Sequence, residues 1–374
     1  MADSFWLSEA APTLASEPLS GVADIEIVGG GVTGISAALS LALLGKRVRV
    51  HEARTVASGA SGRNGGFALR GGAMAYDSAR EWLGDDAAAD YWRLTEAYVE
   101  RMVELGGDAV RRTGSLRLAG DDERDELRAE YEALRDDGFA AEWRDELSEP
   151  LAGRFPGALF HPDDAVLQPA RLVRRLALAA AEAGVEIREH DRVEDLDELD
   201  AEIVLVATDG YPSGLLGELE GLIIPTRGQM LATEPLPERL FPMPHYGRHG
   251  YDYWHQNDEG RLIVGGFRDA DMDSEFTAEE ATTERIQGAL DRFAEALLGR
   301  MPTVTHRWSG VFGLVPDLMP VVGPHPVRAG LWVAGGYSGH GNVLGLMCGD
   351  LVAQAILGES HPLLERMSPA RLVA

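Results

Sequence analysis

The chain has 374 residues, 45% hydrophobic and 25% charged, which is the balance of a folded globular protein and excludes disordered and fibrous classes. Its 34 basic and 61 acidic residues give a formal net charge of −27, which argues against nucleic acid and anionic lipid as partners. Lys46 is the only lysine and Cys348 the only cysteine, so intrachain disulfides and thiolate metal clusters are excluded.

The chain begins with an acidic arm, residues 1–22, whose Phe5, Trp6 and Leu7 we expect to pack on the body of the protein. No run approaches the roughly 18 apolar residues of a membrane span, and the arm lacks the basic start of a secretory signal. We therefore expect no membrane span and a cytoplasmic location.

After the arm, the sequence predicts a strand, a glycine turn, an apolar helix and a second strand, at residues 25–28, 29–34, 35–44 and 48–52. Further helices are expected at 77–104, 121–136, 170–183, 276–299 and 341–357. Further strands are expected at 114–118, 185–187, 203–208, 251–254, 262–267 and 331–334. This order predicts a nucleotide-binding α/β domain assembled from separated segments, with a sheet-and-helix domain inserted twice.

The glycine turn carries the pattern Gly29-x-Gly31-x-x-Gly34 directly after a strand and at the start of a helix. In such a turn the first glycine permits the bend, the second lets the backbone approach a pyrophosphate, and the third lets helix and strand close up. Glu52 ends the second strand, where a carboxylate accepts hydrogen bonds from ribose hydroxyls and repels a 2′-phosphate, so NADP is disfavoured. The competing interpretation, a glycine turn without a ligand, does not account for this acid.

A second glycine-rich stretch, residues 335–342, lies between the last strand and the last helix. It again places a helix N-terminus after glycines that allow the backbone to approach a ligand closely. Glycine-rich stretches near both ends of the chain are typical of a site for one extended cofactor, which favours FAD over NAD. A plain helix cap is the alternative interpretation of this stretch.

Four stretches resemble the D-amino acid oxidase-type flavoprotein superfamily, which contains glycine, sarcosine and γ-glutamylputrescine oxidases. They are DIEIVGGGVTG, EARTVASGASGRNGG, DYWHQNDEGRLIVGGFRD and RWSGVFGLVPDLMPVVGP with GLWVAGGYSGHGN. GASGRNGG and DYW with GGFRD most resemble the γ-glutamylputrescine oxidase branch. The resemblance implies an α/β fold in which a Rossmann-like FAD-binding domain of the glutathione-reductase type is interleaved with an α+β substrate domain built on an antiparallel sheet.

The expected domain segments follow from combining the elements with this resemblance. The FAD-binding domain is predicted at 1–80, 150–215 and 305–374, and the substrate-binding domain at 81–149 and 216–304.

The resemblance implies that FAD takes a hydride from the carbon beside a substrate amine, that the imine then hydrolyses, and that O₂ reoxidises the flavin. The substrate partner is then a small-molecule amine or amino acid. Relatives with covalent flavin use a cysteine in the stretch equivalent to 311–318 or a histidine near 60–66; both are absent, so we expect non-covalent FAD.

The residues implied to bind the cofactor come from both glycine-rich regions and the loop between them. They are Gly29, Gly31, Val32, Thr33, Gly34, Glu52, Ala53, Ala60, Ser61, Arg63, Asn64, Gly65, Gly66, Phe67, Val193, Gly336, Tyr337, Ser338, Gly339, His340, Gly341, Asn342 and Val343.

The substrate side departs from the simplest amino acid oxidases. Phe312 stands near the position where glycine oxidases carry a carboxylate-binding arginine, and Asn342 and Ile263 stand where sarcosine oxidases carry lysines. Because a buried unpaired carboxylate is costly, we expect a larger amine whose remote carboxylate lies near Arg70 or Arg268.

The predicted catalytic and substrate-contacting residues are His340, Tyr253, Arg70 and Arg268. Tyr251, Tyr253 and His255 alternate on one strand and so share one face, where aromatic walls suit an amine. Ordinary sheet packing, and for His340 a structural hydrogen bond, are the alternatives.

Two other functions remain open: a dehydrogenase that passes electrons to a quinone or protein acceptor, and a flavin-binding subunit without catalysis. The ten histidines show no His-x-x-x-His pairing, so no metal site is predicted.

Overall fold

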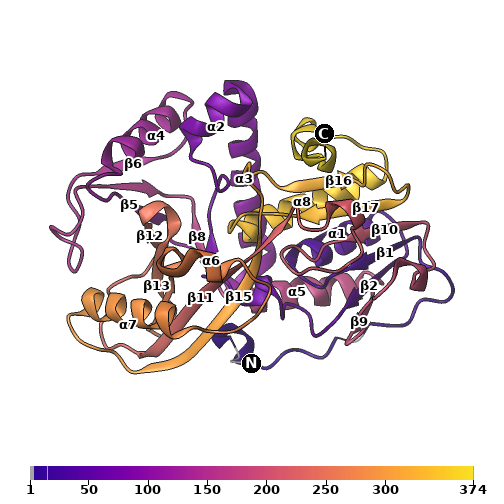
Figure 1. Ribbon diagram of the computed structural model, residues 1–374, viewed down its shortest axis with the longest axis horizontal. Coiled ribbons are helices and arrows are strands. Elements are labelled where there is room, and N and C mark those ends of the chain that lie inside the picture. The colour runs from indigo at the N-terminus through magenta and orange to yellow at the C-terminus, as the bar shows by residue number, and fades with distance from the viewer. Residues whose placement is uncertain (1–3, 15, 374) are drawn as a thin grey trace.

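The computed structural model describes residues 4–14 and 16–373, and it contains a parallel sheet, an eight-stranded sheet and a small three-stranded sheet (Figure 1). The parallel sheet has the order β16 (Val321–Pro324), β17 (Leu331–Gly335), β10 (Ile203–Val206), β1 (Ile25–Val28), β2 (Val48–Glu52) and β9 (Glu186–Glu189). Only the edge strand β16 runs antiparallel to its neighbour.

Both faces of the parallel sheet are buried at its centre, which explains why β10 is apolar along its whole length and why β1 is buried at every position. Ile25 and Ile27 of β1 pack in the core shared with the helices, whereas Val28 packs with Leu215 and Leu219 on the other face. The helices of the first face are α1 (Val32–Leu43), α3 (Asp85–Gly106), α5 (Pro169–Glu182) and α8 (Gly341–Ile356).

Helices α1 and α8 approach closely because glycines lie between them. A Cβ added to Gly345 would lie 2.6 Å from Val32 Cγ1, and one on Gly349 would lie 2.6 Å from the Thr33 carbonyl oxygen. Ser36 Oγ donates to an Asp350 carboxylate oxygen at 2.9 Å across the same contact. The two helices that follow the two glycine turns are therefore held side by side.

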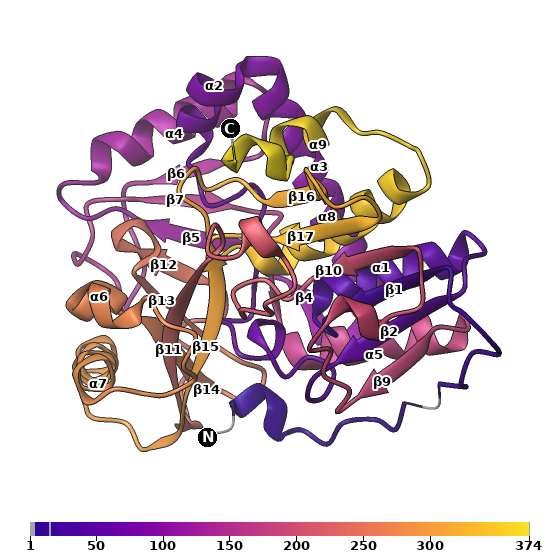
Figure 2. The ribbon, with the colours of Figure 1, turned by 45° about the vertical axis from the view of Figure 1, so that its right-hand side comes forward.

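The second half of the molecule is built on the eight-stranded sheet. Its order is β15 (Val304–Leu314), β11 (Ile224–Pro235), β14 (Arg261–Gly266), β13 (Asp252–Gln256), β12 (His245–Gly247), β5 (Ser115–Leu118), β7 (Ala158–His161) and β6 (Glu142–Arg144). The sheet is antiparallel except between β12 and β5. Figure 2 shows β11 and β15, at one edge of this sheet, on the side nearer the parallel sheet.

The two faces of the eight-stranded sheet have different neighbours. Trp254, Val264 and Leu262 pack with Leu290 of α7 (Glu284–Leu298). Side chains alternate along a strand, so Tyr253, His255 and Ile263 lie on the opposite face, and Ile263 belongs to the core of the nucleotide-binding half. That face is the one presented to the glycine-rich loops.

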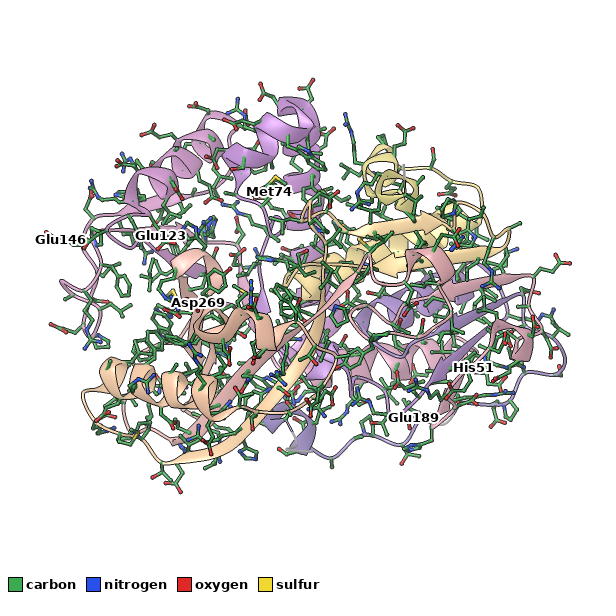
Figure 3. All side chains as sticks on the ribbon, in the orientation of Figure 1. His51, Met74, Glu123, Glu146, Glu189 and Asp269 are labelled. Atoms are coloured by element: carbon green, nitrogen blue, oxygen red, sulfur yellow. The ribbon has the colours of Figure 1, made fainter. Side chains whose placement is uncertain are left out.

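The remaining elements complete the two halves. The three-stranded sheet consists of β3 (Phe67–Ala68), β8 (Ala165–Leu167) and β4 (Val110–Arg112), and the other helices are α2 (Tyr76–Leu83), α4 (Arg124–Asp136), α6 (Met272–Glu275) and α9 (Pro362–Met367). Figure 3 labels Glu189 on the edge strand β9 beside His51 of β2, and Glu123 and Asp269 on the other half, so acidic side chains occur on both halves.

Two helix predictions need correction. The helix expected at 77–104 is divided, because Gly84 adopts φ 87° and ends α2 before α3 begins. The helix expected at 276–299 begins only at Glu284, since the preceding residues form an irregular loop in which the Thr283 N–H donates to Gln229 Oε1 at 2.9 Å. The predicted domain segments stay a prediction; β7 and β15, which fall in expected FAD-binding segments, are strands of the eight-stranded sheet.

Candidate active site

The first glycine turn has no room for side chains. Gly29 has φ 116°, and a Cβ on it would lie 2.6 Å from the Ala207 carbonyl oxygen. A Cβ on Gly34 would lie 2.0 Å from the Gly29 carbonyl oxygen, and one on Gly31 would lie 3.0 Å from Ser61 Oγ. The turn predicted for Gly29 and the helix packing predicted for Gly34 thus have a physical basis in the fold, whereas the approach of Gly31 to a pyrophosphate stays a prediction.

Glu52 lies beside this turn at the carboxyl end of β2. Its carboxylate accepts the N–H of Gly30 and the N–H of Arg54, each at 2.8 Å. A carboxylate has about four acceptor positions, so acceptor capacity for ribose hydroxyls remains.

The loop of residues 57–67, here called the glycine-rich loop, folds against the start of α1. Ser61 Oγ accepts the Val32 N–H at 3.0 Å, and Asn64 Oδ1 accepts the Gly66 N–H at 2.9 Å. Arg63 is turned inward, since its Nε donates to the Ser58 carbonyl at 2.8 Å. Arg63 therefore holds the loop together instead of extending from it.

Loop residues 335–340 form the second glycine turn, and an aspartate that sequence reasoning missed holds it in place. Asp209 follows β10, and its carboxylate accepts the N–H of Gly336 at 2.8 Å and of Gly313 at 2.9 Å. Burial raises the Asp209 pKa, whereas these backbone donors oppose the rise. The signal available in the sequence was an acid immediately after a buried strand, at the edge where ligands of open α/β sheets bind.

The second glycine turn has several residues in the left-handed region: Gly336, Ser338 and Gly339 have φ values of 74°, 50° and 93°. The Ser338 N–H donates to the Gly313 carbonyl at 2.8 Å. Tyr337 is buried, and its hydroxyl lies 2.8 Å from Thr33 Oγ1. Tyr337 and Thr33, both predicted to bind the cofactor, thus connect the second glycine turn to the first turn of α1.

His340 caps α8 without a hydrogen bond from its own side chain to the helix. Burial lowers its pKa to about 4, so the imidazole is neutral at pH 7. Among the described residues, its buried Nδ1 has no hydrogen-bond partner. The position that the sequence predicted for a flavin-facing or substrate-facing histidine thus has a free nitrogen.

Asn342, in the first turn of α8, contacts the glycine-rich loop. Its Nδ2 donates to the Phe67 carbonyl at 2.8 Å, and its side chain pairs with that of Asn64. The fold thereby brings together the two stretches that the sequence assigned to one cofactor.

Tyr253 lies over the same loop from the substrate side. Its ring is 3.2 Å from the position of a Cβ on Gly65 and 2.2 Å from that of a Cβ on Gly265, so both glycines make room for it. The Tyr253 and Phe67 rings meet edge-to-face at 6.0 Å. Burial raises the Tyr253 pKa to about 12, so the phenol stays protonated at pH 7.

The two candidate arginines have different surroundings. The Arg70 side chain is 1% exposed, forms an ion pair with Glu96 and lies 3.0 Å from His161 Nδ1. Arg268 stacks on Tyr251, with its guanidinium carbon 4.4 Å from the ring centroid, and in the described part of the chain no carboxylate pairs with it. Arg268 is therefore the cation with free donors.

Some predicted residues have no contact here that tests a role in binding. Val193 and Val343 are buried, Ala60 is half-buried and Ala53 is exposed. Their assignment stays a prediction.

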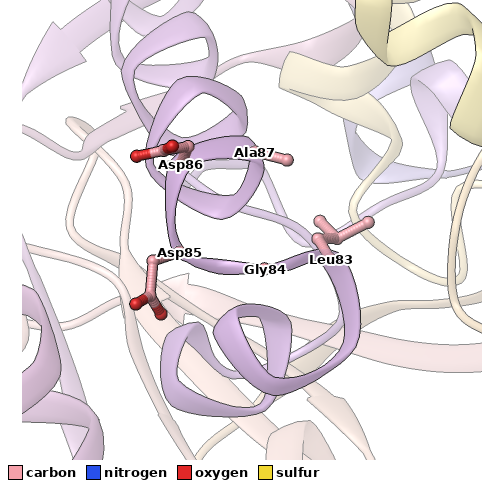
Figure 4. Close-up of a pocket in the computed structure, with 5 residues that line it drawn as sticks. All are labelled: Leu83, Gly84, Asp85, Asp86 and Ala87. Atoms are coloured by element: carbon pink, nitrogen blue, oxygen red, sulfur yellow. The ribbon is translucent and has the colours of Figure 1, made fainter.

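A surface depression of about 480 Å³ lies at the junction of α2 and α3 (Figure 4). Its lining consists of Leu83, Gly84, Asp85, Asp86 and Ala87. No predicted site residue lines it, so it is separate from the site described above. Across residues 4–14 and 16–373, every helix is too short or too polar to cross a membrane.

A family model described as FAD dependent oxidoreductase matches residues 24–355. The chain belongs to this family. The match spans both glycine turns and the strands of both large sheets, so the enzyme class is that of an FAD-dependent oxidoreductase.

Curated relatives of this flavoprotein cover most of its length. It is 27% identical to the probable oxidoreductase OrdL of Haemophilus influenzae, over 91% of this chain and 84% of the relative. It is 27% identical to glycine oxidase of Geobacillus kaustophilus over 89% of this chain and 92% of the relative. It is 26% identical to gamma-glutamylputrescine oxidoreductase of Escherichia coli over 90% of this chain and 84% of the relative.

Solved structures share the whole architecture. Glycine oxidase from Geobacillus kaustophilus superposes with a TM-score of 0.77 at 26% identity, covering 94% of this chain and 99% of that one. L-proline dehydrogenase from P. horikoshii also gives 0.77, at 20% identity, over 95% and 99% of the two chains. The predicted α/β fold with a parallel FAD sheet and a mostly antiparallel second sheet is confirmed.

The family implies FAD, and the first turn fits it. Gly31 presents bare backbone at the N-terminus of α1, where N–H groups favour phosphate, and Glu52 retains acceptor capacity beside it. The residues that would hold FAD are those of the two glycine turns and of the glycine-rich loop.

Proposed function

We propose that the protein oxidises the C–N bond of an amine or amino acid, using non-covalently bound FAD that O₂ reoxidises. The observation that carries the proposal is the meeting of the two glycine-rich regions under Tyr253 of the substrate sheet, joined by the Asn64–Asn342 pair. Bound FAD supplies the acceptor for the hydride that leaves the carbon beside the amine nitrogen.

The residues of this chain favour an uncharged amine at that place. Tyr253 provides an apolar wall with a protonated phenol, and His340 is neutral, because burial lowers its pKa to about 4. A protonated amine has no lone pair to assist loss of a hydride. Activity is therefore expected to rise with pH through the pKa of the substrate amine.

Arg268 is the proposed partner of a substrate carboxylate. Its guanidinium lies against Tyr251 and Phe312 without a paired carboxylate in the described ranges. Arg70 is a weaker candidate, since its donors are already used by Glu96, His161 and the Ala140 carbonyl. An anionic group on the substrate, such as the carboxylate of an amino acid or of a larger acylated amine, matches Arg268.

Non-covalent attachment is supported by the position of the single cysteine. Cys348 is fully buried within α8, and burial raises its pKa well above the usual range, so it is no thiolate nucleophile.

The test is a visible spectrum of the purified protein before and after anaerobic addition of single amines. The panel contains glycine, sarcosine, D- and L-amino acids, putrescine and γ-glutamylputrescine. Bleaching of the flavin bands by one compound identifies the substrate class. Absence of flavin after reconstitution with FAD would contradict the proposal, and a flavin that no amine bleaches would favour a non-catalytic subunit.

A second candidate differs only in the acceptor. Ile263 is fully buried on the strand beside Tyr253, where the resemblance implies a lysine for O₂ activation. The neighbouring His255 is neutral, because burial lowers its pKa to about 3. This apolar strand favours a dehydrogenase with a quinone or protein acceptor. Comparing peroxide yield with dye reduction in the same turnover assay separates the two.

A further inference from the structure

The N-terminal arm lies beneath the glycine-rich loop. Residues Phe5–Ser8 form the short helix η1, and Trp6 is 2% exposed. Trp6 Nε1 donates to the Asn64 carbonyl at 2.8 Å, and Ser4 Oγ donates to the Gly62 carbonyl at 2.8 Å. Two carbonyl groups of the loop therefore receive their donors from the arm.

The loop also packs on the arm through its glycines. A Cβ on Gly62 would lie 2.8 Å from Leu7 Cδ2, and a Cβ on Gly66 would lie 3.3 Å from Trp6 Cζ2. These glycines thus allow the loop backbone to lie directly on the arm.

The arm is fixed to the nucleotide-binding half by α5. Gln168 Nε2 donates to the Trp6 carbonyl at 3.0 Å, and Arg171 forms an ion pair with Glu9 at 2.8 Å. The ion pair is partly exposed, so it is worth little by itself. The hydrogen bonds and the buried tryptophan carry the attachment.

The arm also contacts the substrate sheet. The Trp6 ring stacks on His255, with 6.1 Å between ring centroids and an interplanar angle of 16°. Phe5 meets His306 of β15 edge-to-face at 5.4 Å. His255 is 1% exposed, and neither of its ring nitrogens has a hydrogen-bond partner among the described residues. The arm therefore occupies the seam between the loop and the sheet that carries Tyr253 (Figure 1).

We propose that residues 4–9 are a positioning element of the FAD site. The arm holds the Asn64 backbone through Trp6; the Asn64 side chain pairs with Asn342, and Asn342 belongs to the first turn of α8. This chain of hydrogen bonds links the position of the arm to the conformation of the glycine-rich loop. Through Asn342 it also links the loop to the position of the α8 N-terminus. The inference rests on FAD binding, not on the identity of the substrate or acceptor.

The test compares Trp6→Phe with Trp82→Phe, the same substitution at a tryptophan of α2 that is 46% exposed. At position 6, phenylalanine keeps an aromatic ring but removes the donor to Asn64, whereas Trp82 lies outside both the arm and the glycine-rich loop. We expect Trp6→Phe to weaken FAD binding at least tenfold in a fluorescence titration and to shift the flavin midpoint potential. Trp82→Phe is expected to stay within twofold of the unsubstituted protein in FAD binding.

A second readout needs no FAD. In the apoprotein, Trp6→Phe should speed hydrogen exchange of the Gly62 and Gly66 amides at least tenfold, while amides of the distant helix α7 keep their rates. If Trp6→Phe loses its cooperative thermal transition, Ser4→Ala, which removes a single hydroxyl, decides by the same exchange measurement. Unchanged exchange in the loop of the folded variant would overturn the inference, even if the unsubstituted protein failed to bind FAD.

Discussion

The side-chain amides of Asn64 and Asn342 pair with each other across 278 positions of sequence: each Nδ2 donates to the other Oδ1 at 3.0 Å. Asn64 lies in the glycine-rich loop and Asn342 in the first turn of α8, so this pair joins the two regions assigned to one cofactor. Because two hydrogen bonds join the same two amides, they fix the relative position of the side chains more tightly than a single hydrogen bond does.

We expect Asn342→Ala to weaken FAD binding by about 10- to 100-fold. The substitution removes the donor to the Phe67 carbonyl and one of the partners of the Asn64 amide, and each lost partner costs about 1–3 kcal/mol where the group is buried. Both groups are only partly buried, so the lower part of that range applies. FAD titration of the apoprotein measures the change.

The double substitution Asn64→Ala with Asn342→Ala supplies the control. If the amides act as a pair, the double variant loses less than the sum of the single losses. Additive losses would show that the two side chains act separately on FAD binding.

The first glycine turn was predictable from the sequence because its cause is local. Gly29 and Gly34 are required by backbone atoms within the same strand–turn–helix and its neighbour β10, and a strand followed by this spacing has few other uses. Glu52 followed from the same reasoning, since the end of a paired parallel strand is fixed once the unit is identified.

The surroundings of the arginines were not predictable. Arg70 follows strand β3 and Arg268 follows strand β14, yet Arg70 is paired with Glu96 of α3 and His161 of β7, while Arg268 has no carboxylate partner within the described residues. Which acid meets which arginine depends on how the separate elements pack, and spacing along the chain does not encode it. Asp209 and Trp6 were underestimated for the same reason, since their partners are backbone groups of remote loops.

Arg268→Gln is expected to raise KM for a carboxylate-bearing substrate about 10- to 100-fold. A charge-assisted hydrogen bond to a carboxylate is worth about 1.5–3 kcal/mol, and glutamine retains size but no charge. For an amine without a carboxylate, kcat/KM should change less than threefold. Steady-state kinetics with both substrates measure the difference.

The matched control is Arg248→Gln, because Arg248 lies nearby but is paired with Asp252 and Asp269. It is expected to alter kinetics with both substrates equally. Equal losses for both substrates in Arg268→Gln would contradict the proposed carboxylate contact.

Acid should destabilise the protein partly through His245. Burial lowers its pKa from 6.5 to about 4, and its Nδ1 lies 2.7 Å from the Met243 carbonyl oxygen. Below pH 6.5 the unfolded chain binds a proton that the folded protein refuses, so the free energy of unfolding falls as the pH drops from 6.5 toward 4. Between pH 7 and 4.5 this group accounts for about 2 kcal/mol.

His245→Asn removes the titration and keeps a donor for the Met243 carbonyl. The variant is expected to lose about 2 kcal/mol less stability than the unsubstituted protein between pH 7 and 4.5, measured by urea unfolding at each pH. His249→Asn is the control, since His249 is exposed. If the free energy of unfolding depends on pH in the same way for His245→Asn and the unsubstituted protein, His245 is protonated equally in the folded and unfolded states.

Asp209 should be needed as a carboxylate and not only for its shape. Its oxygens accept the Gly313 N–H of β15 and the Gly336 N–H of the second glycine turn, so one side chain joins the substrate sheet to the turn. Asp209→Asn replaces one acceptor oxygen by an NH₂ group that faces a backbone N–H, and such a conflict costs about 1–3 kcal/mol. We expect urea unfolding to show a loss of that size, together with FAD binding that is weakened at least fivefold.

Asp163→Asn, which changes an exposed ion pair with Arg112, should lose less than about 0.5 kcal/mol. If Asp209→Asn binds FAD with the same affinity as the unsubstituted protein, the second glycine turn does not depend on the charge of this residue. That result would contradict the prediction.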